Sequence, residues 1–201
     1  MTKKVALSFS GGKDSCLALY QLQEQNIDVA CLVTTVWKRN QQTVAHDEKR
    51  DRIKDQAESF NIPVHFIETD FDTYKTDFVE TLKELKRLFA IDGVAFGDIY
   101  LKGHREWGEE VAKEAELKAF YPLWSKKADA LDLLREFVLL DFKAEVIKVD
   151  ATKLPQEWVG RRLDEAFIQA IMQQDVCPMG ESGEYHTTVF DGPVFRYHLR
   201  D

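Results

Sequence analysis

The chain has 201 residues, of which 44% are hydrophobic, enough for one sizeable core and a smaller appended lobe. Its net charge of -8 disfavours a surface built to bind nucleic acid. No apolar run reaches the length of a membrane span, and three scattered cysteines without a C-x-x-C pair favour free thiols in a reducing compartment. We therefore expect a cytoplasmic protein without a membrane partner.

Apolar runs and amphipathic segments alternate through the first half of the chain. Strands are predicted at residues 5–7, 28–36, 64–67 and 93–98, and helices at 15–23, from 46 to 60 and across 78–89. The strands are rich in β-branched and apolar residues, as expected when helices cover both faces of a sheet. The pattern predicts an α/β fold with a doubly wound, mostly parallel sheet.

The alternation loosens in the second half. Helices are predicted at residues 109–116, 126–140 and 163–173, and strands at 119–124, 143–149, 187–190 and 194–199. We expect a boundary near Trp124. It divides the chain into a nucleotide-binding domain, residues 1–124, and a smaller α+β substrate-binding lobe, residues 125–201.

A glycine-rich turn follows the first predicted strand and opens the first predicted helix. Adjacent glycines allow close backbone approach to a bound group, and the amides at a helix start favour an anion. A lysine and several hydroxyls complete a predicted phosphate site, whose residues are Ser8, Ser10, Gly11, Gly12, Lys13, Asp14 and Ser15. The turn is not a Walker A loop, because Asp14 and not Ser or Thr follows Lys13.

Two further segments carry ionisable side chains at predicted loop positions. Gly97 and Asp98 end the fourth predicted strand, and His104 and Arg105 follow closely, so we expect them at the carboxyl edge of the sheet. His46 starts a predicted helix near the same edge, where a surface position is the alternative.

A loop rich in glycine spans residues 175–187 and contains Glu181 and Glu184, three residues apart. A solvated acidic loop is the simplest interpretation of its composition. Cys177 in this loop is interpreted as a buried thiol, because no histidine is placed beside it by the sequence.

The run Ser10–Ser15 resembles the pyrophosphate-binding loop of the ATP pyrophosphatase, or PP-loop, superfamily. That resemblance implies a HUP-type fold like that of the adenine nucleotide alpha hydrolases, and cleavage of ATP between its α and β phosphates. It also implies that Asp14 helps to hold Mg2+.

Further motifs make the chain similar to the diphthine–ammonia ligase family over nearly its whole length. They are residues 97–100 with His104 and Arg105, and residues 121–124, 144–149 and 180–187. The last motif has the family form G-E-G-G-E-Y-E-T, with Ser182 replacing the second glycine and His186 the last glutamate. The family also has a histidine after its second strand, which His46 matches.

The resemblance implies an ATP-dependent ligase. A carboxylate on a small molecule or protein attacks the α phosphate, pyrophosphate leaves, and ammonia or an amine attacks the acyl-adenylate. Lys13, Asp98, Glu181 and Glu184 are the expected catalytic residues, with the roles of the two glutamates left open. His46, Gly97, His104 and Arg105 join the loop as ATP-binding residues.

Two alternatives use the same phosphate loop. One is a tRNA-modifying enzyme, which the acidic charge and the missing cysteine pair disfavour. The other is a regulatory module that binds an adenine nucleotide without turnover. The acceptor, the nitrogen donor and assembly into a homo-oligomer are left open by the sequence.

Overall fold

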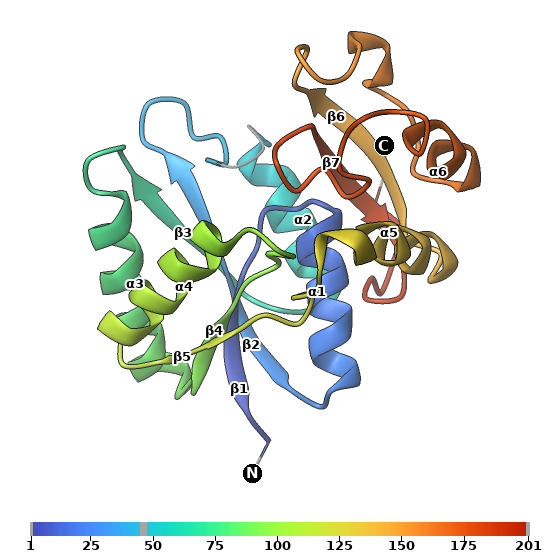
Figure 1. Cartoon of the computed structure of the whole chain (residues 1–201). Coiled ribbons are helices and arrows are strands. Elements are labelled where there is room, and N and C mark those ends of the chain that lie inside the picture. The colour runs from blue at the N-terminus through green and yellow to red at the C-terminus, as the bar shows by residue number, and fades with distance from the viewer. Residues whose placement is uncertain (1, 45–47, 200–201) are drawn as a thin grey trace.

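A five-stranded parallel sheet forms the centre of the molecule (Figure 1). The computed structural model describes residues 2–44 and 48–199. The strands are β1 (Lys4–Ser8), β2 (Asp28–Trp37), β3 (Val64–Thr69), β4 (Gly93–Ala95) and β5 (Lys118–Phe120). Their order is β3-β2-β1-β4-β5, and every neighbouring pair is parallel. The predicted α/β, doubly wound sheet is therefore confirmed.

Helices cover both faces of this sheet. They are α1 (Lys13–Glu24) and α2 (Arg50–Phe60) on one face and α3 (Tyr74–Phe89) and α4 (Lys102–Glu114) on the other. Alternate residues of β1 enter different cores, since Val5 and Leu7 pack towards α1 while Ala6 packs towards α3 and α4. Burial on both faces explains why β1 and β2 are apolar almost throughout.

The last third of the chain forms a smaller α+β lobe around an antiparallel pair of strands. Its elements are η1 (Lys127–Asp129), α5 (Ala130–Leu139), β6 (Lys143–Val149), η2 (Gln156–Trp158), α6 (Glu165–Ile171) and β7 (Tyr185–Asp191). One continuous core joins α1 and α2 to this lobe, so the two helices lie between the sheet and β7 (Figure 1). No described helix is long and apolar enough to cross a membrane.

Three predicted boundaries and one predicted strand are wrong. Strand β5 ends at Phe120 and not at Trp124. Strand β4 ends at Ala95 and not at Asp98, and α4 begins at Lys102 and not at Glu109. The predicted strand at residues 194–199 is irregular, because Arg196 N donates to Ser59 O and not to a strand partner. The predicted helix start at His46 falls outside the described residues.

Candidate functional site

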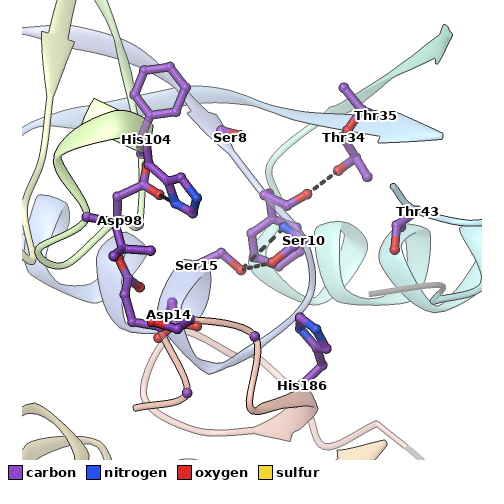
Figure 2. A pocket seen from close by; sticks show the side chains of 18 of the residues that line it. Ser8, Ser10, Asp14, Ser15, Thr34, Thr35, Thr43, Asp98, His104 and His186 are labelled. Carbon is purple, nitrogen blue, oxygen red and sulfur yellow. Dashed lines mark hydrogen bonds and ion pairs between the residues drawn. The ribbon is translucent and has the colours of Figure 1, made fainter. Parts of the chain in front are cut away.

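A cavity of about 640 Å³ opens at the carboxyl ends of β1 and β2 (Figure 2). Its walls come from the turn after β1, from β2, from the segment between β4 and α4, and from the loop that precedes β7. Parallel strands end at the same edge of a sheet, so these segments meet although they are far apart in the sequence. Eight predicted site residues line the cavity: Ser8, Ser10, Asp14, Ser15, Gly97, Asp98, His104 and Glu181.

The turn between β1 and α1 is held by the C-terminal lobe. Gly11 has a φ of +82°, where a side chain is strained, and an added Cβ would lie 2.6 Å from Ile53 Cδ1. The carbonyl of Gly11 accepts hydrogen bonds from Val189 N at 3.1 Å and from Gln56 Nε2 at 2.9 Å. Gln56 Nε2 also donates to Val189 O at 2.7 Å. The turn is thus a rigid part of the interface between sheet and lobe.

Helix α1 begins at the cavity wall with hydroxyl groups around its first turn. Ser15 Oγ donates to Gly12 O at 3.1 Å and lies 3.4 Å from both N and Oγ of Ser10. Gly97 lies so close that an added Cβ would be 3.2 Å from the backbone of Asp14. Backbone amides and hydroxyls at a helix start suit an anion such as a phosphate.

Lys13 does not line the cavity and is instead buried behind it. Its Nζ lies 3.1 Å from Asp14 Oδ2 and 4.6 Å from the centre of the Tyr185 ring. The side chain is only 2% exposed, and Lys13 N donates to Thr187 Oγ1 at 3.0 Å. Lys13 therefore joins the turn to β7 through charge and packing.

The Asp14 carboxylate has one oxygen, Oδ2, paired with Lys13, and a second oxygen, Oδ1, that is not paired in this way. Its Oδ1 is buried and has no hydrogen-bond partner within residues 2–44 and 48–199. Burial raises the pKa of Asp14, and the Lys13 ammonium opposes that rise. An oxygen in this state suits a ligand that carries positive charge.

Asp98 and His104 form a hydrogen-bonded pair at the part of the wall that follows β4. His104 Nδ1 lies 3.0 Å from Asp98 Oδ1, and this contact raises the pKa of His104. Asp98 lies in the segment after β4, while His104 lies in the first turn of α4. The early start of α4 places the imidazole beside the carboxylate.

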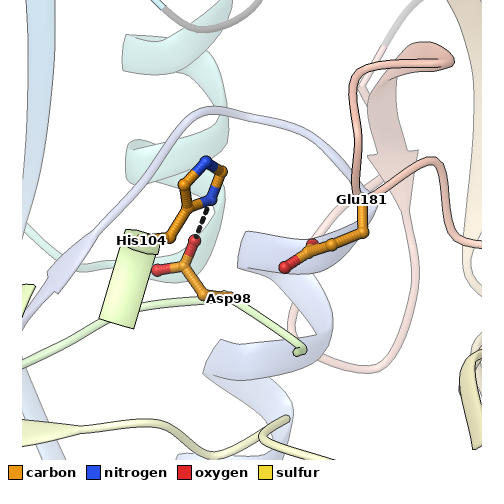
Figure 3. A group of neighbouring side chains, drawn as sticks. All are labelled: Asp98, His104 and Glu181. Carbon is orange, nitrogen blue, oxygen red and sulfur yellow. Dashed lines mark hydrogen bonds and ion pairs between the residues drawn. The ribbon is translucent and has the colours of Figure 1, made fainter. Parts of the chain in front are cut away.

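Glu181 reaches the same wall from the C-terminal lobe (Figure 3). Its Oε1 accepts hydrogen bonds from Ile99 N at 2.8 Å and Tyr100 N at 3.4 Å. Burial, with the charges of Asp14 and Asp98, raises the pKa of Glu181 to about 7. Ligand atoms of Asp98, His104 and Glu181 all lie within 4.8 Å of one another.

Glu184 does not line the cavity, although it is the second predicted catalytic glutamate. It is 6% exposed, and its Oε2 accepts a hydrogen bond from Ser182 N at 2.8 Å. Its Oε1 accepts from Cys177 N at 3.3 Å. The carboxylate thus ties together both ends of the loop that presents Glu181.

The remaining predicted site residues do not line the cavity or lie outside the described residues. Gly11 and Gly12 shape the turn from behind the cavity wall. Arg105 faces away, with Nε 2.7 Å from Glu109 Oε1 and its guanidinium 4.7 Å from the centre of the Trp124 ring. His46 lies outside the described residues.

Sequence reasoning missed several residues that line the cavity. Thr34 and Thr35 lie towards the carboxyl end of β2, and Thr34 Oγ1 donates to Phe9 O at 2.7 Å. Two polar residues near the end of a predicted parallel strand were a usable signal. Tyr74, at the start of α3, carried no such signal, since the packing of α3 on the sheet brings it there.

Known proteins are similar in sequence to this chain over nearly its full length. The sequence model of the diphthamide synthase N-terminal domain matches residues 3–119, and that of the diphthamide synthase C-terminal domain matches residues 129–200. The chain belongs to this family. The resemblance expected from the motifs is confirmed, and the chain is an enzyme of the ATP-dependent, amide-forming ligase type.

The diphthine–ammonia ligase of Mus musculus is 31% identical over 221 residues, which cover 96% of this chain and 80% of the relative. That of Homo sapiens is 28% identical over 222 residues, with the same coverage. Among solved structures, a U34-tRNA thiolase from Methanococcus maripaludis superposes with a TM-score of 0.44 and 18% identity. That superposition covers 69% of this chain and 57% of the thiolase.

Proposed function

We propose that this enzyme uses ATP to adenylate a carboxylate, releases pyrophosphate, and amidates the activated acyl group with ammonia or an amine. One observation carries the proposal. In a member of the diphthamide synthase family, the phosphate-type turn Ser10–Ser15 and the acidic loop around Glu181 open onto the same cavity. The acceptor class is a carboxylate such as the diphthine named for the relatives, on a protein or a small molecule.

In this proposal the two units of the chain bind different reactants. Residues 1–124 bind ATP, with its phosphates at the start of α1 and its base towards the apolar wall that includes Val33 and Phe96. Residues 125–201 present the acceptor carboxylate to the α phosphate, and their acidic loop brings Glu181 to the side of the cavity where the nitrogen donor binds. Glu184 acts as a positioning residue, because its bonds hold the loop and do not face the cavity.

Magnesium fits the Asp14 side of the cavity. Asp14 Oδ1 is a buried carboxylate oxygen without a partner among the described residues, and hard cations prefer such oxygens. We propose Asp14 as the residue that would hold a Mg2+ ion in this cavity. When bound, the ion neutralises negative charge on the phosphates.

The chemistry follows in two steps. A carboxylate oxygen bonds to the α phosphorus, the bond to the bridging oxygen breaks, and pyrophosphate leaves with its electron pair. Nitrogen then bonds to the acyl carbon, the acyl carbon–oxygen bond breaks, and AMP leaves. Amides at the start of α1, with Ser10 and Ser15, stabilise the charge that develops on the leaving pyrophosphate.

Product analysis tests the proposal. The full-length chain is incubated with ATP, MgCl2, ammonium chloride and a panel of carboxylate acceptors that includes a diphthine-bearing protein. We expect AMP and pyrophosphate in equal amounts with the right acceptor, whereas ADP and phosphate would refute the proposal. Asp14→Asn should lose this activity, while the control Asp51→Asn, at an exposed position on α2, should keep it.

The two alternatives predict other results. A tRNA-modifying enzyme would bind tRNA tightly and with strong salt dependence. Cys16, Cys31 and Cys177 are free and buried, and none of the three lines the cavity, so no cysteine thiol is presented there for thiolation. A regulatory module would bind ATP without forming AMP with any acceptor.

A further inference from the structure

The cavity beside the phosphate turn concentrates negative charge from three separate parts of the chain. Asp98 follows β4, Glu181 comes from the acidic loop, and Asp14 lies in the first turn of α1. Figure 3 shows the Glu181 carboxylate directed towards Asp98, with His104 completing the group. Lys13, the nearby buried cation, is already paired with Asp14.

The side chains in this group are held in place before any ligand binds. Backbone N–H groups of Ile99 and Tyr100 fix Glu181 Oε1, and His104 Nδ1 fixes Asp98 Oδ1. His104 Nδ1 is engaged with Asp98 Oδ1, so the imidazole acts by holding the Asp98 carboxylate in place. The group then offers the remaining oxygens of two carboxylates, which are acceptors with negative charge.

The chemistry of the acceptors selects among small cations. Ligands about 2.1 Å from Mg2+ lie about 3 Å apart when they are neighbours and about 4.2 Å apart when they are opposite, and this ion prefers oxygen to imidazole. Hydrogen-bond acceptors about 2.9 Å from an ammonium nitrogen lie up to about 4.7 Å apart in a tetrahedral arrangement. One ligand atom from each of Asp98, His104 and Glu181 lies within 4.8 Å of the others, and the oxygens of two carboxylates at such a spacing suit the N–H groups of an ammonium ion.

We propose that Asp98, His104 and Glu181 form the ammonium-binding subsite of this enzyme. The proposal rests on the proposed amidation, which needs a nitrogen donor, and it names free ammonium as that donor. It also separates the two glutamates, since Glu181 contacts the nitrogen while Glu184 only positions the loop.

Glu181 also receives a proton in this proposal. Bound ammonium transfers one proton to the Glu181 carboxylate, and the freed nitrogen lone pair forms the bond to the acyl carbon. The acyl carbon–oxygen bond breaks with its electron pair on AMP, and the new amide nitrogen loses its second proton to water. The pKa of Glu181, raised to about 7 by burial and by Asp14 and Asp98, makes it a stronger base than an ordinary carboxylate.

Thallium(I) tests the site without any need for turnover, because it has the charge and nearly the size of ammonium and scatters X-rays anomalously. Crystals of the full chain are soaked in thallium acetate. We expect an anomalous peak between Asp98, His104 and Glu181 that ammonium chloride displaces and sodium chloride does not. A peak elsewhere, or none, would overturn the proposal, as would Mn2+ or Zn2+ bound among these three residues at lower concentration.

A charge-removing variant provides the matched comparison. Glu181→Gln keeps the shape of the side chain and should lose the thallium peak, whereas Glu157→Gln, at an exposed position on η2, should keep it. In an active assay, Glu181→Gln should raise the KM for ammonium about tenfold or more, with little change in the KM for ATP. An unchanged KM for ammonium would refute the subsite. Absence of AMP formation by the native chain, with the thallium peak present, would refute only the proposed amidation.

Discussion

Two loops line the cavity, the phosphate turn Ser10–Ser15 and the acidic loop that contains Glu181, and they differ in how their groups are paired. The turn Ser10–Ser15 is tied to its surroundings by backbone and side-chain bonds, including those from Gln56 and Val189 to Gly11 O. The acidic loop instead presents Glu181 to two other carboxylates. The hydrogen bonds of the turn make it rigid. In the acidic loop, the negative charge of Glu181 repels those of Asp14 and Asp98, and a bound cation can relieve this repulsion. Stability and ligand binding should therefore respond differently to changes in each loop.

The largest effect is expected from Lys13→Ala. The change leaves the Asp14 carboxylate without its buried partner and removes the contact with the Tyr185 ring. We expect the free energy of unfolding to fall by about 3 kcal/mol, because an uncompensated charge remains in a buried position. Denaturant titration measures this loss. In the control Lys54→Ala, which breaks the exposed pair with Asp51, the loss should be below about 0.5 kcal/mol, and equal losses would contradict the comparison.

Gly11→Ala should weaken both folding and ATP binding. An alanine there has a strained φ, and its Cβ would lie 2.6 Å from Ile53 Cδ1 and 2.8 Å from Gln56 Oε1. We expect about 2 kcal/mol of destabilisation and a matching rise in the Kd for ATP, measured by calorimetry. Gly103→Ala is the matched control, since no atom lies within 4 Å of its added Cβ and alanine favours the helix. An ATP affinity unchanged in Gly11→Ala would show that the turn does not shape the phosphate site.

Glu184→Gln should separate loop order from nucleotide binding. An amide in place of the carboxylate weakens its bonds to Ser182 N and Cys177 N, so we expect a loss of about 1–2 kcal/mol in stability. Turnover should fall because Glu181 is then poorly positioned, while the Kd for ATP stays close to that of the native chain. Equilibrium binding with ATP alone makes the distinction, and a large loss of ATP affinity would place Glu184 in the nucleotide site.

The smallest expected effect is a gain in stability and not a loss, and it comes from removing the charge of Glu181. The pKa of Glu181 is about 7 in the folded chain, against 4.5 for an unperturbed glutamate, so the folded state binds its proton more tightly than the unfolded state. The contribution of Glu181 to stability should therefore decrease as pH rises from 4.5 to 7 and stay low above pH 7. Without divalent or ammonium ions, Glu181→Gln should be more stable than the native chain at pH 8, by about 1 kcal/mol after allowance for solvent screening. Thermal melts of both chains at pH 5 and pH 8 provide the measurement. We expect the melting temperature of the native chain to fall further below that of Glu181→Gln at pH 8 than at pH 5, and the reverse order would refute this sign.

Local patterns predicted most of the fold because they report burial directly. The apolar strands β1 and β2 are covered on both faces, and the stripe on α3 packs on the sheet, with the exception of the exposed Leu88. The error at α4 has a tertiary cause. Its first turns have few apolar residues, yet Trp107 packs on Phe78 and Phe96, and Tyr121 Oη donates to Arg105 O.

The apolar spacing of residues 194–199 has another physical cause than strand pairing. Phe195 packs edge-on against Phe60 of α2, with 4.7 Å between the ring centres, and Leu199 N donates to Phe190 O. Val194 and Leu199 are buried at the two ends of the segment while Tyr197 is exposed, so apolar residues in a short run do not show which backbone groups pair. Here the segment packs on α2 without forming a strand ladder.

The sequence by itself determined the family, the alternation of strands and helices, and the turn that suits phosphate, because each is encoded in consecutive residues. Only the tertiary structure decided which ionisable groups meet. It buried Lys13 behind the cavity, turned Arg105 away and assigned Glu184 to the backbone of its own loop. It also brought Asp98, His104 and Glu181 together. Residues three apart, such as the two glutamates, differ in environment because a loop can turn one side chain inward to its own amides and the other outward to a shared cavity.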